Sequence, residues 1–428
     1  MLLFCTIQFI FLNSSNIRLE IKEAFQHSWN NYKSFAWGYD EIQPLDGGKH
    51  DNWGGVGVTM IDALDTAILM NMHKEVQDAT LWIRYKWSFQ KDHFFNVFEM
   101  TIRVLGGLIS AYELTHNPLF LNKANEVALS FVPAFNGSKL PLSEVNTLKK
   151  MSRNGYTNLA QQGSVQLEFH RLAFLTKNKL FMNAADSWSH IYNKAIRPIS
   201  LNAEYDSLHE YVLKMYLMNT RNYHIKKGYN KMLNTIYKSL LIRCKSAIFL
   251  KAKNKNYMDH LSCFTPGMIA LGILTNTTYS PNKDLNLAKK LTTACYRLYN
   301  TPTGLSGDKF TISSRCEHCS CQIKTIDSKY VLRPETVESL FYMWRLTKNE
   351  KYRAWGYNIF KSIQKHCYAK FGYAALKNVF SGEKSNEQPT FWMAELLKYL
   401  WLLFSDDNIL DLNKWILNTE AHFFAKEN

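Results

Sequence analysis

Residues that interrupt helices are scarce in this sequence. Its 428 residues include only 10 prolines and 19 glycines, and stretches that alternate polar and apolar residues like a β-strand are few. Hydrophobic residues make up 46% of the chain and aromatic residues 14%, which is ample for a large core and argues against intrinsic disorder. The composition therefore predicts a mostly helical, folded protein.

Acidic residues are also in short supply. The 51 Lys and Arg outnumber the 36 Asp and Glu, which gives a formal net charge of +15, and no Asp or Glu occurs between Lys214 and Lys255. A basic segment of this kind can bind nucleic acid or an anionic membrane surface. Here Leu, Ile, Met and Tyr recur among the lysines at helical spacing, and no glycine-rich phosphate loop accompanies them. We therefore expect the solvated face of two core helices and no nucleic-acid partner.

Cysteines are too few for a disulfide scaffold, with eight in the whole chain. Cys316, Cys319 and Cys321 surround His318 at a spacing that could bind zinc, but no second pair of ligands lies nearby in the sequence. The alternative is that these cysteines form local disulfides or remain free thiols in a variable loop.

Residues 1–16 form an apolar N-terminal segment that we exclude from the fold. Residues 1–12 carry no charge, resemble the central region of a signal peptide without its basic start, and are too short to cross a bilayer as a helix. A signal peptide, a truncated membrane anchor and a misplaced start all stay open, and membrane association is expected only through this segment. Glycosylation sequons at Asn13, Asn136 and Asn276 are compatible with a secretory route.

From about residue 17 onward, helical patterns alternate with loops. Many repeat apolar residues at i, i+3, i+4 and i+7, and neighbours often lie two to six residues apart, as in antiparallel helical hairpins. Roughly seven hairpins without a strand system predict a closed α/α barrel or an irregular helical array, and no fixed repeat indicates a solenoid. The predicted helices are 17–36, 58–72, 95–115, 118–132, 158–176, 179–195, 205–218, 222–244, 260–273, 283–299, 334–347, 349–366 and 391–404.

One predicted helix begins with two carboxylates. Pro334 suits a first helical turn, and Glu335 and Glu338 follow on one face where the helix dipole favours acidic side chains, with Arg333 just outside. Taken alone, this arrangement is either a capped helix with a surface ion pair or an acid–base site on a rigid helix. The apolar residues that follow would anchor the helix in a core and leave its acidic end facing outward.

Glu99 and Arg103 lie four residues apart on another predicted helix. An exposed pair at this spacing is worth only tenths of a kcal/mol, about 0.2–0.5. The neighbouring residues are too apolar for an ordinary surface pair, so this helix too could carry a buried polar site.

Six segments, read in order, resemble motifs of the class I α-1,2-mannosidases, glycoside hydrolase family 47, and most closely those of its endoplasmic-reticulum members. The resemblance covers about residues 19–422 and implies an all-α fold, an (α/α)7 barrel, formed by one catalytic domain over residues 17–428. The segments are FEMTIRVLGGL (98–108), DSLHEY (206–211), HLSCFTPG (260–267), RPETVESLFYMWRLT (333–347), FWMAELLKY (391–399) and NTEAH (418–422).

The resemblance also implies a site. Glu99 would be the general acid and Glu335 the base, with Asp206 assisting. Thr419 would give hydroxyl and backbone oxygens to Ca²⁺, with carboxylates holding the remaining ligand waters. The residues that would bind substrate are Arg103, His260, Arg333, Glu338, Phe391, Glu395 and Glu420.

The implied reaction is hydrolysis of terminal α-1,2-linked mannose from high-mannose N-glycans of glycoproteins, with inversion. We expect a monomer in the lumen of the endoplasmic reticulum or Golgi, with the family's disulfide between Cys263 and Cys295. The sequence departs from the family's usual residues at Glu204, Gln161 and Pro389, which leaves branch choice open. A glycan-binding pseudoenzyme in glycoprotein quality control is the alternative.

Overall fold

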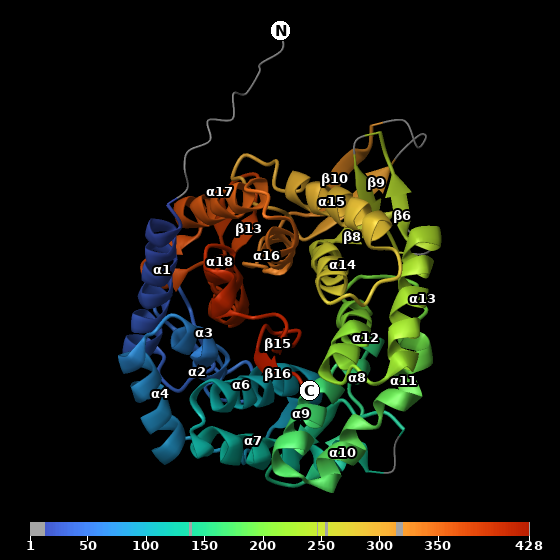
Figure 1. Cartoon of the computed structure of the whole chain (residues 1–428). Helices are drawn as coiled ribbons and strands as arrows, with labels where there is room; N and C mark the ends of the chain where they lie inside the picture. The colour runs from blue at the N-terminus through green and yellow to red at the C-terminus, as the bar shows by residue number, and fades with distance from the viewer. Residues whose placement is uncertain (1–12, 137–138, 246, 253–255, 314–319, 428) are drawn as a thin grey trace.

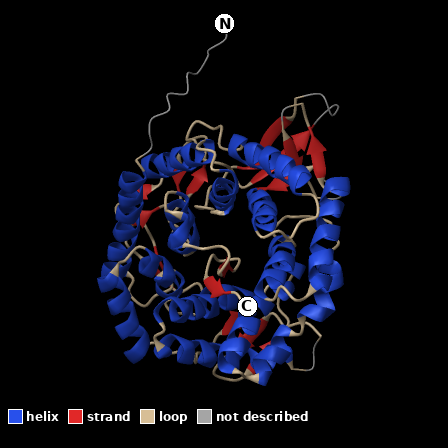
Figure 2. Cartoon of the chain, viewed as in Figure 1, coloured by secondary structure: helices blue, strands red, loops and turns tan. Residues whose placement is uncertain are grey.

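The helices alternate between an outer and an inner ring as the chain proceeds (Figures 1 and 2). The structure is a computed structural model that describes residues 13–136, 139–245, 247–252, 256–313 and 320–427. The inner ring contains α2 (Val58–Asp62) with α3 (Leu64–Leu69), α6 (Gly106–Thr115), α9 (Gln166–Thr176), α12 (Asp206–Met218), α14 (Thr265–Leu274), α16 (Glu335–Thr347) and α18 (Leu397–Leu403). The outer ring contains α1 (Ser14–Phe35), α4 (His73–Tyr85), α7 (Pro118–Phe131), α10 (Lys179–Ala185) with α11 (Trp188–Ala195), α13 (Tyr223–Ser239), α15 (Pro281–Arg297) and α17 (Lys351–His366). This arrangement is the expected (α/α)7 barrel.

Burial distinguishes the two rings. Inner helix α14 is apolar on nearly all sides and is buried from Thr265 through Gly272, as expected for a helix surrounded by protein. Outer helix α4 buries only Ala79 and Ile83. Its narrow apolar stripe explains why α4 is absent from the helices predicted from sequence.

Short antiparallel strands connect the helices. No strand system was predicted, because strands of two to six residues are too short to produce a visible alternation. Two sheets have three strands: β3 (Phe94–Asn96), β4 (Glu144–Asn146) and β5 (Met151–Arg153) with β4 in the centre, and β8 (Tyr257–Asp259), β9 (Lys309–Ser313) and β10 (Gln322–Asp327) with β9 in the centre. The two-stranded pairings are β1 (Glu41–Ile42) with β2 (Lys49–His50), β6 (Leu241–Arg243) with β7 (Ile248–Leu250), β11 (Tyr368–Ala369) with β12 (Gly372–Tyr373), β13 (Leu376–Asn378) with β14 (Glu383–Lys384), and β15 (Trp415–Leu417) with β16 (Phe423–Ala425).

The last hairpin, β15–β16, enters the centre of the barrel and contacts α6 and α12 (Figure 1). The Asn418 side chain accepts hydrogen bonds from the backbone N–H of Glu420 (2.9 Å) and His422 (2.8 Å), which fixes the turn between the strands. A Cβ added at Gly106 would lie 2.7 Å from the Asn418 side-chain nitrogen, and one at Gly107 would lie 2.7 Å from a backbone oxygen. Gly106 therefore lets the turn lie directly against α6, and Gly107 lets α6 lie close to the backbone of Ile61 in α2.

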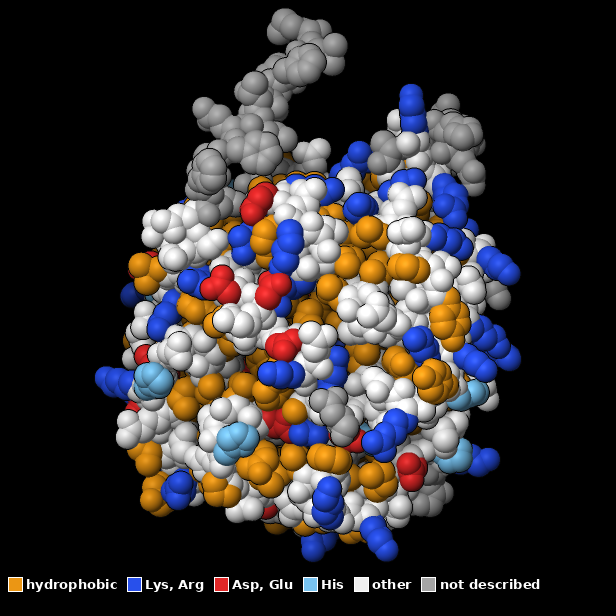
Figure 3. All heavy atoms as spheres, in the orientation of Figure 1, with side chains coloured by type: hydrophobic (Ala, Val, Ile, Leu, Met, Phe, Trp, Pro, Cys, Tyr) orange, Lys and Arg blue, Asp and Glu red, His pale blue; other side chains and the backbone are white. Residues whose placement is uncertain are grey.

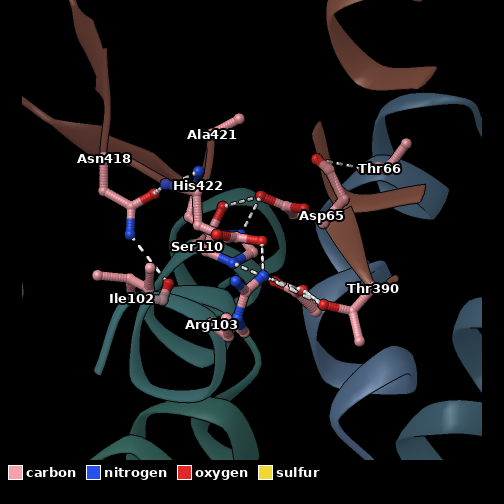
Figure 4. Close-up of polar contacts among 12 residues, drawn as sticks. Asp65, Thr66, Ile102, Arg103, Ser110, Thr390, Asn418, Ala421 and His422 are labelled. Carbon is pink, nitrogen blue, oxygen red and sulfur yellow. Dashed lines mark hydrogen bonds and ion pairs between the residues drawn. The ribbon is translucent and has the colours of Figure 1, made fainter. Parts of the chain in front are cut away.

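A buried ion-pair network holds this turn in place (Figure 4). The His422 ring contacts Asp65 (3.0 Å) and Asp62 (3.1 Å), and Lys398 lies 2.9 Å from the second oxygen of Asp65. Burial alone would raise the pKa of Asp65, but the charges of Lys398 and His422 lower it to about 2. Because an unpaired buried charge is costly, these four side chains stabilise the turn only as a set.

Two disulfides join neighbouring elements. Cys263–Cys295 links the 3-10 turn η3 (His260–Phe264), directly before α14, to α15 with a Cα–Cα distance of 5.8 Å, which confirms the predicted pair. Cys321 bonds to Cys244, 77 residues away, so the expectation of a local disulfide or free thiol is wrong for this residue. Cys316 and Cys319 lie outside the described residues.

The basic segment is only partly a solvated face. Lys227, Lys231 and Lys238 of α13 are exposed, and Figure 3 shows Lys and Arg gathering along the edge where α13 runs. Lys214 is instead 2% exposed and paired inside the barrel. No helix in the described part of the chain is long and apolar enough to cross a membrane. Helix α1 begins at Ser14, inside the segment assigned to the N-terminus, and residues 1–12 are outside the described ranges.

Candidate active site

A cavity of about 330 Å³ opens inside the inner ring, with the turn of β15–β16 in its wall. Seven carboxylates and two guanidinium groups line it, namely Glu99, Asp206, Glu210, Glu335, Glu338, Glu395, Glu420, Arg103 and Arg333. Phe391 and Thr419 complete the set of predicted site residues in this wall. Segments more than 300 residues apart in sequence therefore meet here.

Two π-helical turns shape the wall. The predicted helix 95–115 consists of α5 (Val97–Met100), the π-helical η1 (Thr101–Leu105) and α6, and the predicted helix 391–404 begins with the π-helical η4 (Trp392–Leu396). Arg103 lies in η1 and Glu395 in η4, and both line the cavity. Such insertions are frequent at functional sites because they redirect side chains without ending the helix.

Arg103 is the centre of the polar contacts at one side of the cavity (Figure 4). Its Nε donates to Glu99 at 3.0 Å, and its Nη1 pairs with Glu420, donates to the Thr390 hydroxyl at 3.2 Å and lies 3.6 Å from Asp62. The expected pair of Glu99 and Arg103 is therefore present, in a largely buried setting. Removing the guanidinium would leave buried carboxylates without a partner.

Two aromatic rings flank the same guanidinium. Its carbon lies 5.4 Å from the Trp53 ring centroid and 5.7 Å from that of Phe391, within cation–π range. The Trp53 indole N–H donates to Glu41 at 3.1 Å. Arg103 is thus fixed by rings as well as by carboxylates.

The buried His260 positions the Glu335 side chain. The Nδ1 of His260 lies 2.9 Å from a Glu335 oxygen, and its Nε2 faces the hydroxyls of Tyr299 (2.8 Å) and Thr336 (3.1 Å). His260 is 1% exposed and is not part of the cavity wall. The structure therefore places His260, expected among the substrate-binding residues, as a partner of Glu335.

The start of α16 differs from the arrangement expected from sequence alone. Its acidic end faces the cavity and not the outside, and Glu338 is only 7% exposed. Arg333 pairs with Asp308 through two contacts, 2.5 and 3.3 Å, and not with a surface glutamate. Leu332 adopts a positive φ of 60°, an uncommon conformation for a bulky residue, directly before Arg333.

Burial and mutual repulsion raise the proton affinity of several carboxylates in the cavity wall. Burial raises the pKa of Glu338, Glu395 and Glu420 well above the usual range, and neighbouring carboxylates add to the effect. Burial, with contributions from Glu210 and Glu335, raises the pKa of Asp206 to about 7. These carboxylates cannot all ionise without compensating positive charge, so the cavity favours a cation or a group that develops positive charge.

Sequence reasoning missed Glu210 and its partner. Lys214 pairs with Glu210 and donates to the backbone oxygen of Asn418 at 2.8 Å, which connects α12 to the central turn. The signal was the same i, i+4 pair on an apolar helix that singled out Glu99 and Arg103. Asp308 offered no local signal, because its partner Arg333 is distant in sequence.

Thr419 offers oxygens for a hard cation. It lies at the turn of β15–β16 in the cavity wall, and within the described residues neither its hydroxyl nor its carbonyl oxygen takes part in a hydrogen bond. No group of three or more His, Cys, Asp or Glu in the described ranges is arranged as a direct metal site. Two oxygens from Thr419, surrounded by carboxylates that can bind ligand waters, fit the donor preferences of Ca²⁺.

The three departures from the family pattern lie at different places. Gln161 lines the cavity, and its buried side-chain oxygen has no hydrogen-bond partner among the described residues. Glu204 is exposed beside Ala203, which lines the cavity. Pro389 directly precedes Thr390, whose hydroxyl contacts Asp62 and Arg103.

Comparisons with known proteins agree with the site. The family model for glycosyl hydrolase family 47 matches residues 24–198 and 190–426. The chain is 37% identical to mannosyl-oligosaccharide 1,2-alpha-mannosidase MNS1 of Arabidopsis thaliana, over 95% of this chain and 78% of that protein. It is 35% identical to the endoplasmic reticulum mannosyl-oligosaccharide 1,2-alpha-mannosidase of Rattus norvegicus, over 94% of this chain and 66% of that protein. The solved alpha-1,2-mannosidase from Trichoderma reesei superimposes with a TM-score of 0.89 at 27% identity, covering 96% of this chain and 99% of that one. Because sequence and structure agree over nearly the whole barrel, the chain belongs to glycoside hydrolase family 47.

Proposed function

We propose that this chain hydrolyses terminal α-1,2-linked mannose from high-mannose N-glycans, with inversion at the anomeric carbon. The observation that carries the proposal is the carboxylate-lined cavity, in which residues from all six of the family's motif segments meet. An inverting glycosidase needs one carboxylic acid and one carboxylate on opposite sides of the scissile bond. A cavity with several carboxylates of different proton affinity can supply both.

In this proposal Glu99 donates a proton to the leaving oxygen, and Glu335 activates the water that attacks the anomeric carbon. Their side chains are 20% and 13% exposed, more open than Glu338 or Glu395, so substrate and water can reach them. His260 orients Glu335, and Asp206, with its pKa of about 7, can take up or release a proton beside it.

The other wall residues would hold the sugar. The Phe391 ring offers an apolar face to a sugar ring, and Arg333, fixed by Asp308, can donate hydrogen bonds to hydroxyl groups. Ca²⁺ would be held by Thr419 and by waters on neighbouring carboxylates of the cavity wall. When bound, the ion would orient sugar hydroxyls and supply positive charge among these carboxylates.

The relatives include endoplasmic-reticulum mannosidases, which supports a setting in the secretory pathway. We propose that residues 17–428 act as one catalytic domain and as a monomer in the lumen of the secretory pathway, in the endoplasmic reticulum or Golgi. Any membrane association would involve residues 1–16. The buried Cys263–Cys295 disulfide favours an oxidising compartment.

The test of the activity is mannose release from a nine-mannose glycan. Replacing the base, Glu335→Gln, should lower turnover about 10²–10⁴-fold while largely preserving glycan affinity. Glu383→Gln, at an exposed carboxylate of β14, is the matched control and should leave the rate unchanged. Glycan binding without any release by the unmodified protein would refute the proposal and identify a glycan-binding pseudoenzyme.

The calcium proposal has its own readout in thermal unfolding. Ca²⁺ should raise the melting temperature of the unmodified protein over that in chelator, because a ligand that binds only the folded state stabilises it. Thr419→Val keeps the shape but removes the hydroxyl and should abolish most of this shift, whereas Thr419→Ser should retain it. Equal shifts in Thr419→Val and the unmodified protein would place the ion elsewhere.

A further inference from the structure

A second cavity, of about 350 Å³, lies between two loops that are far apart in sequence. The hairpin β1–β2 forms one side, and the segment between β14 and η4 forms the other. Its lining residues are Glu41, Ile42, Gln43, His50, Ser385, Asn386 and Glu387. None of these residues belongs to the six motif segments that line the first cavity.

Part of the wall is already fixed by hydrogen bonds. The Asn386 side chain accepts from the backbone N–H of Leu45 at 2.9 Å and donates to Asp46 at 2.9 Å, which joins the two loops. Glu41 accepts from Asn52 at 2.9 Å. The cavity is therefore built before any ligand arrives.

The rest of the wall offers unused polar groups. Within the described residues, the Gln43 amide, the His50 ring, the Ser385 hydroxyl and the Glu387 carboxylate make no side-chain hydrogen bond. Together they present both donors and acceptors. The two carboxylates of the wall, Glu41 and Glu387, disfavour an anion, whereas a neutral ligand with many hydroxyl groups matches this mixture.

The second cavity is adjacent to the first. Trp53 donates to Glu41 on one side and packs on Arg103 of the catalytic cavity on the other. Glu387 is four residues before Phe391, so the chain between them spans at most about 14 Å. One branched ligand can therefore reach both cavities.

From this geometry we propose that the second cavity binds a sugar residue of the same glycan whose terminal mannose occupies the first cavity. The inference rests on the proposed function and adds a subsite to it. Gln43 and His50 would contact hydroxyl groups of a mannose beyond the cleaved bond. This subsite would favour whichever branch places a sugar between β1–β2 and residues 385–387.

The experiment compares two substrates in the full chain. The double variant Gln43→Ala/His50→Ala should raise KM for a nine-mannose glycan about tenfold, because two sugar hydrogen bonds are lost. Its turnover of the α-1,2-linked mannose disaccharide, which is too small to reach the second cavity, should be unchanged. Asn234→Ala, on the outer face of α13, is the control for a polar surface truncation and should alter neither.

A steric variant tests the same subsite without removing its groups. A Cβ at Gly48 would lie 2.1 Å from the Gln43 side-chain oxygen, so Gly48→Ala should displace that amide and raise KM for the glycan alone. An unchanged KM for the glycan in both variants would overturn the subsite, and so would an equal loss on the disaccharide. An unmodified protein that releases mannose from neither substrate would instead contradict the proposed function.

Discussion

Removing the charge of Arg103 should lower the free energy of unfolding more than removing one partner of a surface ion pair. Arg103 is 8% exposed and contacts Glu99, Glu420 and Asp62. Arg103→Met keeps the length of the side chain but leaves Glu420 without its partner, while Asp62 keeps His422. Breaking a buried pair from one side costs about 3–5 kcal/mol, so we expect the free energy of unfolding to fall by that amount.

The assay is denaturant-induced unfolding at pH 7, with Lys377→Met as the matched control. Lys377 and Glu383 form a pair at 2.8 Å whose side chains are more than half exposed, so its loss should cost less than about 1 kcal/mol. Arg103→Lys keeps the charge without the planar fork and should fall between the two. A loss below about 1 kcal/mol for Arg103→Met would refute the view that this guanidinium compensates buried carboxylates.

Three further predictions concern the disulfide, proton binding and specificity. Cys263→Ser should lower the free energy of unfolding by about 3–4 kcal/mol in the chain-entropy account. Reductant should weaken the unmodified protein more than the variant, which keeps only Cys244–Cys321; equal sensitivity of both to reductant would contradict it. Because the folded pKa of Asp206, about 7, exceeds its unfolded value near 4, the folded state binds the extra proton between these pH values, and stability should fall as pH rises through them. In calcium-free buffer the stability of Asp206→Asn should lack this part of the decline. If the variant's stability depends on pH as that of the unmodified protein does, the raised pKa of Asp206 would be disproved. Glu204 can only accept hydrogen bonds, so we expect trimming of a nine-mannose glycan that is not confined to one branch, and Glu204→Arg should sharpen it; a single dominant eight-mannose isomer from the unmodified protein would count against this.

Local pattern predicted most of the helices but not their irregularities. The apolar spacing of α12 and α16 gave their ends within a residue or two, because capping and burial act over a few neighbouring residues. The π-helical turns η1 and η4 left no such signal, since an inserted residue is stabilised by contacts across the barrel. Helix α4 went unrecognised because two buried residues are too few to define a face.

The site residues were found by motif, while their partners were not. Glu99, Asp206 and Glu335 could be named from the chain, but the contacts of Arg333 with Asp308 and of His422 with Asp62 depend on how distant segments meet. The orientation of α16 is a similar case. An acidic helix start is stable either in solvent or inside a polar cavity, so its sequence alone did not determine which way it faces.

The most direct test is the anomeric form of the mannose first released from a nine-mannose glycan, followed by proton NMR. Inversion at an α-linked mannose gives the β-anomer, which later equilibrates with the α-anomer in water. We therefore predict an initial β-anomer signal that is lost in Glu335→Gln, the variant that lacks the proposed base. An initial α-anomer signal, or release that persists at the normal rate in Glu335→Gln, would contradict the proposed mechanism.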